Sequence, residues 1–250
     1  MSKKQQLREL QIREQRRKSM ITLGIVGGVA LLLVGALVVG SLLTRQNLPP
    51  LPEPIASTRE LPANAGASSR DWGPANAPVK IEEFMDYQCP VCGTFNKTNE
   101  AAIVAAFSAT GKVRYEVKYY PVVDTITNGR ESSDAGQAAV CAAEQDKFWP
   151  MHNTLFANQF AEGRGTFSKP RIKQIAALVP GLNAATFATC LDSDKNTKVV
   201  QSDSVEAQRR GVNSTPSFFI NGQRMNSNAI PTLDDFKREI ARIAPGVSLN

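Results

Sequence analysis

The longest apolar stretch of the chain covers residues 21–43, "ITLGIVGGVALLLVGALVVGSLL", and contains no charged side chain. As a helix it would reach about 34 Å at about 1.5 Å per residue, enough to cross the hydrocarbon core of a bilayer. A secretory signal peptide has a shorter apolar core, of about 7–15 residues, and is followed by small residues of the A-x-A type. The pattern therefore predicts an uncleaved transmembrane helix at residues 21–43.

The segments on either side of this stretch differ in charge and composition. Residues 1–20 contain seven Lys or Arg and two Glu, and so supply five of the six net positive charges. Positive charge beside a membrane span favours the cytoplasm, so this tail is predicted to be cytoplasmic and everything after Leu43 extracytoplasmic. The remainder is nearly neutral, which argues against nucleic-acid binding. Residues 44–70 are rich in Pro and small polar residues and are predicted to be a linker.

After the linker, the apolar pattern indicates a strand, a helix and a second strand. Residues 78–85 alternate so that Glu83 shares a face with apolar side chains. Residues 89–110 have helical spacing and stop before Gly111, and residues 112–122 have the composition of a strand. Two strands joined in this way form a βαβ unit, whose strands are parallel.

The rest of the chain is predicted to be a helical stretch, a hairpin and a last helix. Residues from about 132 to 210 have helical spacing throughout. Residues 214–225, "STPSFFINGQRM", are typical of two strands joined by an Asn-Gly turn, and residues 231–243 of an amphipathic helix. The fold class is therefore α/β, and residues 71–250 are expected to form β-α-β, a helical insertion, and then β-β-α.

All four cysteines, Cys89, Cys92, Cys141 and Cys190, follow the predicted membrane span, on the side where disulfides persist. A redox pair, half of a zinc site and a static staple would all fit the C-x-x-C of Cys89 and Cys92. Zinc would need further ligands, and the sequence has one C-x-x-C and a single histidine, His152. A staple that closes so short a loop would add little stability. A redox pair is the favoured interpretation.

The position of the pair at a helix start has a chemical consequence. Pro90 suits the first helical position, which places Cys89 at the N-cap and Cys92 in the first turn. The unpaired N–H groups and the helix dipole at that end favour a negative charge on the Cys89 sulfur and lower its pKa. Cys89 is therefore predicted to be the attacking and leaving sulfur, and Cys92 the resolving sulfur.

Three motifs occur together: a C-P-x-C at a helix start after a strand, a later Thr-Pro before "SFFING", and a helical stretch between them. With this combination, residues 71–243 resemble the DsbA-like branch of the thioredoxin superfamily. The resemblance implies a thioredoxin fold with a helical insertion at about 132–210, and thiol–disulfide oxidoreductase activity without cofactor or metal. It also implies that Pro216 is cis beside the cysteine pair, with Thr215 opposite Cys89 where substrate peptide is received.

Polar residues just before the pair are candidates for supporting roles. Glu83 stands where the family has a buried acidic residue, and a carboxyl group there could carry the proton of Cys92. The alternative is that Glu83, or the adjacent Glu82, is a solvated strand residue. Asp86 and Gln88 are expected to shape the approach to the site rather than to take part in the chemistry.

The remaining candidates lie in the helical insertion. Cys141 and Cys190 fall on separate predicted helices, and we interpret them as a structural disulfide. Two buried free thiols, or a second redox pair, are the alternatives. His152, in "KFWPMHNTLF", is expected to be a packed helix residue beside aromatic core side chains and not a catalytic one.

The expected function is to introduce disulfides into reduced secreted or surface proteins. The enzyme would act as a monomer, and a quinone-linked membrane reoxidase, DsbB-like or VKOR-like, would restore its disulfide. No separate dimerisation domain is evident, which favours an oxidase over an isomerase or reductase of the same fold. A tethered chaperone or binding module is the non-enzymatic alternative. Pro90-Val91 lacks the histidine common in strong oxidases, so thiolate stabilisation would depend more on the helix end.

Overall fold

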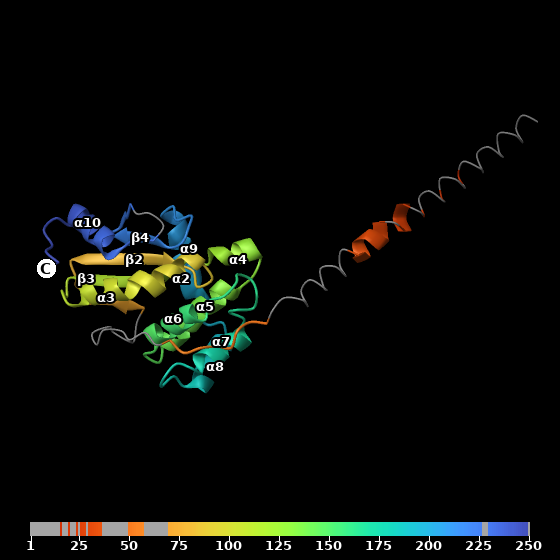
Figure 1. Cartoon of the computed structure of the whole chain (residues 1–250), viewed down its shortest axis with the longest axis horizontal. Helices are drawn as coiled ribbons and strands as arrows, with labels where there is room; N and C mark the ends of the chain where they lie inside the picture. The colour runs from red at the N-terminus through yellow and green to blue at the C-terminus, as the bar shows by residue number, and fades with distance from the viewer. Residues whose placement is uncertain are drawn as a thin grey trace, which may run out of the picture. The chain divides into compact units, whose positions relative to one another are not determined.

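The structure is a computed structural model that describes residues 50–57, 70–226 and 230–249, together with Arg16, Met20, Gly24, 26–28 and 30–36. Contacts within the chain divide it into two units, Met1–Leu51 and Pro52–Asn250. The strands and the helices discussed below all belong to the second unit (Figure 1).

Within the described residues, no helix has both the length and the apolar character needed to cross a bilayer. About half of the expected membrane helix at residues 21–43 lies outside the described part of the chain, as do most of the tail at 1–20 and most of the linker at 44–70.

A mixed sheet forms the centre of the domain, with the strand order β1-β3-β2-β4-β5. Its strands are β1 (Asp71–Trp72), β2 (Val79–Met85), β3 (Val113–Tyr119), β4 (Ser217–Ile220) and β5 (Gln223–Arg224). β2 and β3 pair in parallel, as a βαβ unit requires, and β4 pairs antiparallel with β2. β2 is thus an inner strand, and its carboxyl end points to the cysteine pair.

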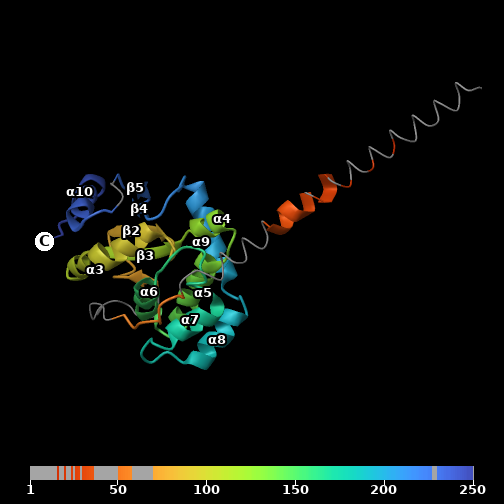
Figure 2. The same ribbon diagram turned by 45° about the vertical axis from the view of Figure 1, so that its right-hand side comes forward.

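Helices connect and cover the strands. They are α2 (Pro90–Phe95), η1 (Asn96–Glu100), α3 (Ala101–Ser108), α4 (Val122–Thr127), α5 (Glu131–Ala143), α6 (Phe148–Ala157), α7 (Lys169–Ala176), α8 (Ala184–Asp192), α9 (Thr197–Arg209) and α10 (Leu233–Ile243). Figures 1 and 2 both show α6, α7 and α8 gathered at one end of the domain and α10 at the opposite end. The predicted order of β-α-β, helical insertion and β-β-α is therefore present.

Two local predictions differ from the structure. The single helix expected at 89–110 is interrupted by η1, a π-helical segment whose wider turn buries both Asn96 and Glu100. The strand expected to reach Val122 ends at Tyr119, and α4 follows directly. β-branched residues made this stretch resemble a strand, but Pro121 at the N-cap of α4 has no N–H to donate to a sheet.

A stretch of the predicted linker contacts the domain. The side-chain amide of Asn158 donates to the carbonyl oxygen of Ile55 at 2.6 Å and accepts from its N–H at 2.7 Å. The guanidinium of Arg171 donates to the carbonyl oxygen of Pro52. Composition indicated a tether that builds no core of its own, and the structure adds that Pro52 and Ile55 of this tether contact the domain.

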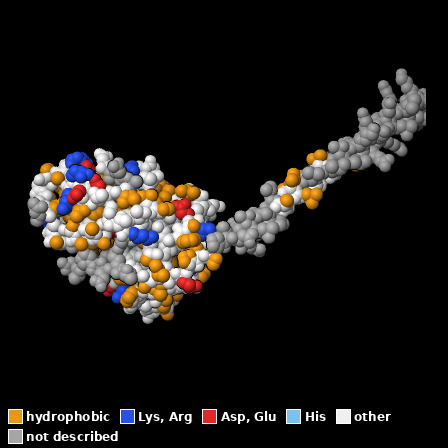
Figure 3. All heavy atoms as spheres, in the orientation of Figure 1, with side chains coloured by type: hydrophobic (Ala, Val, Ile, Leu, Met, Phe, Trp, Pro, Cys, Tyr) orange, Lys and Arg blue, Asp and Glu red, His pale blue; other side chains and the backbone are white. Residues whose placement is uncertain are grey.

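On the face shown in Figure 3, acidic and basic side chains lie intermixed near α10. Arg238 pairs with Asp235 and Arg242 with Glu239, all on this helix. Side chains of opposite charge therefore neutralise one another locally, in line with the near-neutral composition of the domain.

The helical insertion is cross-linked by a disulfide between Cys141 on α5 and Cys190 on α8, with sulfur atoms 2.01 Å apart. Their separation of 49 residues means that the bond closes a long loop in the unfolded chain. Asn196 directs its side-chain amide at both sulfur atoms, at 3.5 and 3.3 Å. The disulfide therefore links α5 to α8, and the side-chain amide of Asn196 contacts both of its sulfur atoms.

Replacing both residues, Cys141→Ala and Cys190→Ala, should lower the free energy of unfolding by about 4 kcal/mol, because the unfolded chain regains the entropy of that loop. Denaturant titration of the oxidised protein, with Cys89 and Cys92 unchanged, measures the loss. A decrease below about 1 kcal/mol would contradict the prediction.

Candidate active site

The two cysteines of the C-x-x-C are reduced in this structure and lie where β2 gives way to α2. Cys89 is the N-cap residue of α2, with extended backbone angles, and Pro90 takes the first helical position. The Cys89 side chain is 8% exposed whereas Cys92 is fully buried. Of the two cysteines, Cys89 is therefore the one nearer to solvent.

The turn that contains Pro216 lies against Cys89. The Thr215–Pro216 peptide bond is cis, and the Cys89 thiol donates to the carbonyl oxygen of Thr215 at 3.3 Å. Thr215 and Pro216 directly precede β4, and Cys89 follows β2. Because β4 pairs with β2, the sheet brings the Thr215–Pro216 turn next to the loop that carries Cys89.

The pKa values of the two thiols are shifted in opposite directions. The pKa of the Cys89 thiol is lowered to about 6, first by a hydrogen bond from the Cys92 thiol, and then by Thr215 and the N–H groups of Cys92 and Val91. Burial raises the pKa of Cys92 well above its usual value, and the nearby Cys89 and Glu83 add to this. The protein thus stabilises a thiolate at Cys89 and a thiol at Cys92.

Glu83 lies on β2 with only 2% of its surface exposed. Its carboxyl group accepts a hydrogen bond from the Tyr115 hydroxyl on β3. Burial, followed by the charge of Glu100, raises the pKa of Glu83 well above the ordinary value. Glu83 therefore keeps its proton to a higher pH than a surface glutamate would.

The neighbouring Glu82 is also buried, but its environment has the opposite effect. It lies on the other face of β2, 3.0 Å from both Arg210 and Lys118. Burial opposes ionisation, yet these two cations outweigh it and lower the pKa of Glu82 to about 2. Of the two adjacent glutamates, only Glu83 is therefore suited to carry a proton.

Asp86 and Gln88 are buried and hold the loop before Cys89. The Asp86 carboxylate accepts from the N–H groups of Gln88 at 2.8 Å and Val123 at 2.9 Å, and burial raises its pKa to about 7. Gln88 donates to the Ser132 hydroxyl and accepts from the N–H of Gly163, both at 2.8 Å. The two residues fix the loop to α4 and to the helical insertion.

Gln159, just after α6, also supports the redox loop. Its side-chain nitrogen donates to the carbonyl oxygens of Tyr87 and Cys89, at 2.7 and 2.8 Å. The Gln159 side chain occupies the space beside Gly93, where a Cβ atom would lie 1.8 Å from its oxygen. The sequence analysis missed Gln159 because its partners are 70 or more residues away and no local pattern marks it.

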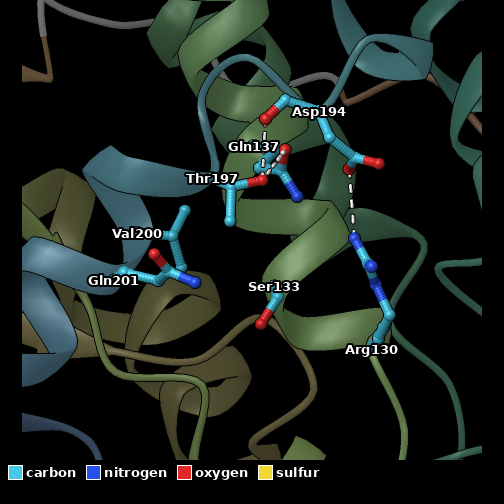
Figure 4. A pocket seen from close by; sticks show the side chains of 7 residues that line it. All are labelled: Arg130, Ser133, Gln137, Asp194, Thr197, Val200 and Gln201. Carbon is cyan, nitrogen blue, oxygen red and sulfur yellow. Dashed lines mark hydrogen bonds and ion pairs between the residues drawn. The ribbon is translucent and has the colours of Figure 1, made fainter.

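Two other kinds of potential site were considered, a surface hollow and a metal-binding cluster. A hollow of about 280 Å³ between α5 and α9 is bordered by the Arg130–Asp194 ion pair and the Thr197–Gln137 hydrogen bond, and the cysteine pair does not line it (Figure 4). Among the described residues, no cluster of three or more His, Cys, Asp or Glu side chains could hold a metal ion.

The sequence matches the model of a known protein family. The family model described as "Thioredoxin" matches residues 67–241. The chain belongs to this thioredoxin family. The cysteine pair, the cis Thr215–Pro216 bond and the mixed sheet lie within the matched region of this thioredoxin-family protein.

Individual relatives are similar over most of the chain. Probable disulfide bond formation protein D of Bacillus anthracis is 25% identical over 225 residues, which cover 88% of this chain and 94% of that protein. Disulfide bond formation protein D of Bacillus subtilis is 26% identical over 176 residues, covering 70% and 76%. Oxidised BdbD from Bacillus subtilis shares the fold, with a TM-score of 0.61, 23% identity and coverage of 75% and 98%.

These relatives and the cysteine pair identify the thioredoxin-family protein as a thiol:disulfide oxidoreductase. The roles of individual residues follow from the geometry above. Cys89 is the less buried and the more acidic thiol, Cys92 is fully buried and holds its proton, and Glu83 lies among the groups that act on Cys92.

The close approach of the Gln159 side chain to Gly93 provides a test of whether Gln159 holds the redox loop in place. Gly93→Ala should destabilise the protein by about 2 kcal/mol, because it displaces Gln159 from two hydrogen bonds. In a Gln159→Ala background the same substitution should be neutral or stabilising by up to about 1 kcal/mol, because Ala is the better helix former. Denaturant unfolding of the four proteins measures both values, and equal effects in the two backgrounds would refute the coupling.

Proposed function

We propose that this protein is a membrane-anchored, extracytoplasmic oxidase that introduces disulfides into reduced secreted or surface proteins. The apolar segment at 21–43 and the basic residues before it support the anchor and its orientation. Relatives named for disulfide bond formation support the direction of the reaction. The observation that carries the proposal is the position of Cys89 at the N-cap of α2, beside the cis Thr215–Pro216 bond and one turn before the buried Cys92. In line with this geometry, the pKa of Cys89 is lowered and that of Cys92 is raised.

The reaction begins with the oxidised pair. A substrate thiolate attacks the sulfur of Cys89, the less buried of the two cysteines, the Cys89–Cys92 bond breaks, and its electron pair goes to the Cys92 sulfur, which takes a proton from Glu83. A second substrate thiolate then attacks the substrate sulfur of the mixed disulfide and releases Cys89 as a thiolate. The substrate loses two electrons, and the enzyme is left as a thiolate at Cys89 and a thiol at Cys92.

The low pKa of Cys89 determines the direction of the thiol–disulfide exchange. A thiolate with a low pKa is a good leaving group, and its stabilisation favours the reduced enzyme, which makes the disulfide oxidising. Pro90-Val91 supplies no cation, so the stabilisation comes from the Cys92 thiol, Thr215 and backbone N–H groups. We therefore expect an oxidant stronger than thioredoxin, whose potential is about −270 mV, and weaker than DsbA, at about −120 mV.

Turnover requires a partner that removes the two electrons. A quinone-linked membrane reoxidase of the DsbB-like or VKOR-like class fits an enzyme anchored in the same membrane. The enzyme would act as a monomer, and its substrates would be unfolded or reduced secreted proteins that reach Cys89 beside the Thr215–Pro216 turn.

Redox equilibration of the full chain with glutathione, followed by the thiolate absorbance of the reduced form, tests the oxidase assignment. We expect an absorbance change with a pKa of about 6 that is lost in Cys89→Ser. A potential near that of thioredoxin would indicate a reductase, and absence of insulin reduction would indicate a binding module. A thiol pKa near 9 would contradict the proposal.

The same shift predicts how stability depends on pH. The pKa of Cys89 is lower in the folded protein, at about 6, than the ordinary 9.0. Its contribution to the stability of the reduced protein is therefore complete above about pH 9 and is lost as the pH falls through 6. Between these limits, the unfolding free energy of the reduced protein should rise with pH relative to that of Cys89→Ser. Parallel curves for the two proteins would contradict this.

The anchor is tested separately by fractionation. The full chain should remain in membranes after an alkaline carbonate wash, whereas a chain that lacks residues 1–43 should be released. Recovery of the full chain in the soluble fraction would contradict the anchor and leave the redox assignment intact.

A further inference from the structure

The connection between α9 and β4, residues 210–216, carries the turn that lies against Cys89. Near its start, Gly211 has a φ of 70°, in the left-handed region that glycine adopts most readily, and this ends the helix. At its end, Thr215 and Pro216 lead directly into β4. The connection belongs to neither a helix nor a strand, so its position depends on the side chains that bond to it.

Arg224 on β5 bonds to both ends of this connection. Its Nη1 donates to the carbonyl oxygen of Gly211 at 3.1 Å, and its Nη2 donates to the hydroxyl of Ser217 at 3.4 Å. β5 lies beside β4 at the edge of the sheet, with Arg224 opposite Phe219 (Figure 2). Ser217, two residues before Phe219, faces the same side of the sheet. The register therefore brings the guanidinium, a fork of several N–H donors, within reach of two acceptors.

The Ser217 hydroxyl closes a bond around the turn. It donates to the carbonyl oxygen of Ser214 at 2.8 Å, so the two serines bracket Thr215 and Pro216. A hydroxyl has one proton to donate and accepts with its oxygen. Because the oxygen of Ser217 accepts from Arg224, its proton remains for Ser214, and a donor that also accepts forms a stronger bond. Arg224 thus acts, through Ser217, on the residue directly before Thr215.

The bracketed turn acts on the reacting sulfur. The carbonyl oxygen of Thr215 lies 3.3 Å from the sulfur of Cys89. The pKa of Cys89 is lowered first by the Cys92 thiol and then, against the opposing effect of burial, by a hydrogen bond from the Thr215 side chain. Hydrogen bonds weaken steeply as their geometry departs from the optimum, so a displaced turn would lose this contribution.

We propose that Arg224 and Ser217 form a brace that holds the Thr215–Pro216 turn at hydrogen-bonding distance from Cys89, which makes Arg224 a positioning residue for thiol–disulfide exchange. Both members of the brace act through the turn. The proposal deepens the exchange reaction described above, on which it rests, and holds whichever direction that reaction runs in the cell.

The test is the thiolate absorbance of the reduced full chain, titrated with acid. In Arg224→Ala and in Ser217→Ala the pKa of Cys89 should rise by at least about half a unit, a threefold change in proton affinity, because the turn is released. Ser217→Ala removes no charge, so a rise there reports the brace and not the loss of a cation. Ser217→Thr keeps the hydroxyl and should keep the normal pKa. Arg224→Lys keeps the charge but not the fork, and its pKa should lie between the normal value and that of Arg224→Ala.

The double variant, Arg224→Ala with Ser217→Ala, measures the coupling between the two residues. Because they hold the turn as a unit, the double variant should raise the pKa of Cys89 about as much as either single variant does. Additive rises would indicate two independent effects and would overturn the brace. A normal pKa in both single variants would overturn it as well.

Arg114→Ala is the matched control. Arg114 is an arginine of the same sheet, on β3, but it pairs with Asp71. Its replacement should leave the pKa of Cys89 unchanged. A rise equal to that in Arg224→Ala would indicate a general loss of positive charge and would speak against the brace. Arg224 is exposed on a two-residue edge strand, so its Ala and Lys variants carry the test even where the buried Ser217 tolerates no change.

Failure of the brace and failure of the oxidase assignment give different results. A Cys89 pKa near 9 in the unaltered chain would count against the oxidase assignment. Equal and low values in the unaltered chain and both single variants would count against the brace alone.

Discussion

The start of α2 is the constraint on which the rest of the domain depends. One sulfur must be held as an anion where backbone N–H groups are unpaired, while its neighbour one turn later keeps its proton. The N-cap position of Cys89 and the burial of Cys92 produce this difference. The parallel pairing of β2 with β3 and the antiparallel pairing with β4 place the helix start beside the Thr215–Pro216 turn.

The helical insertion takes part in the site rather than merely covering it. Ser132 at the start of α5, Gly163 in the loop after α6, and Gln159 all bond to the segment that precedes or begins α2. The insertion is itself held together by the Cys141–Cys190 disulfide. A stable insertion therefore makes the redox loop more rigid, because several hydrogen bonds join the insertion to that loop.

Local patterns predicted the elements that local forces determine. Alternation revealed β2 and the inward direction of Glu83, and the Cys-Pro start of α2 indicated which sulfur is acidic. The family resemblance supplied the cis geometry of Pro216. Three features had no local signal. The five residues of η1 are all polar, so the apolar spacing on either side of it still fits a single helix. Gln159 and Tyr115 acquire their roles only when the chain brings distant partners together.

The contacts of residues 52–57 affect where the domain can be cut for study. A soluble form that begins at Asp71 would remove Ile55, and the Asn158 amide, 7% exposed, would lose the N–H and the carbonyl oxygen of Ile55 as partners. Asn158 directly precedes Gln159, which holds the carbonyl of Cys89. A truncation at the apparent edge of the fold would therefore disturb the redox loop, and a boundary before Pro52 would preserve it.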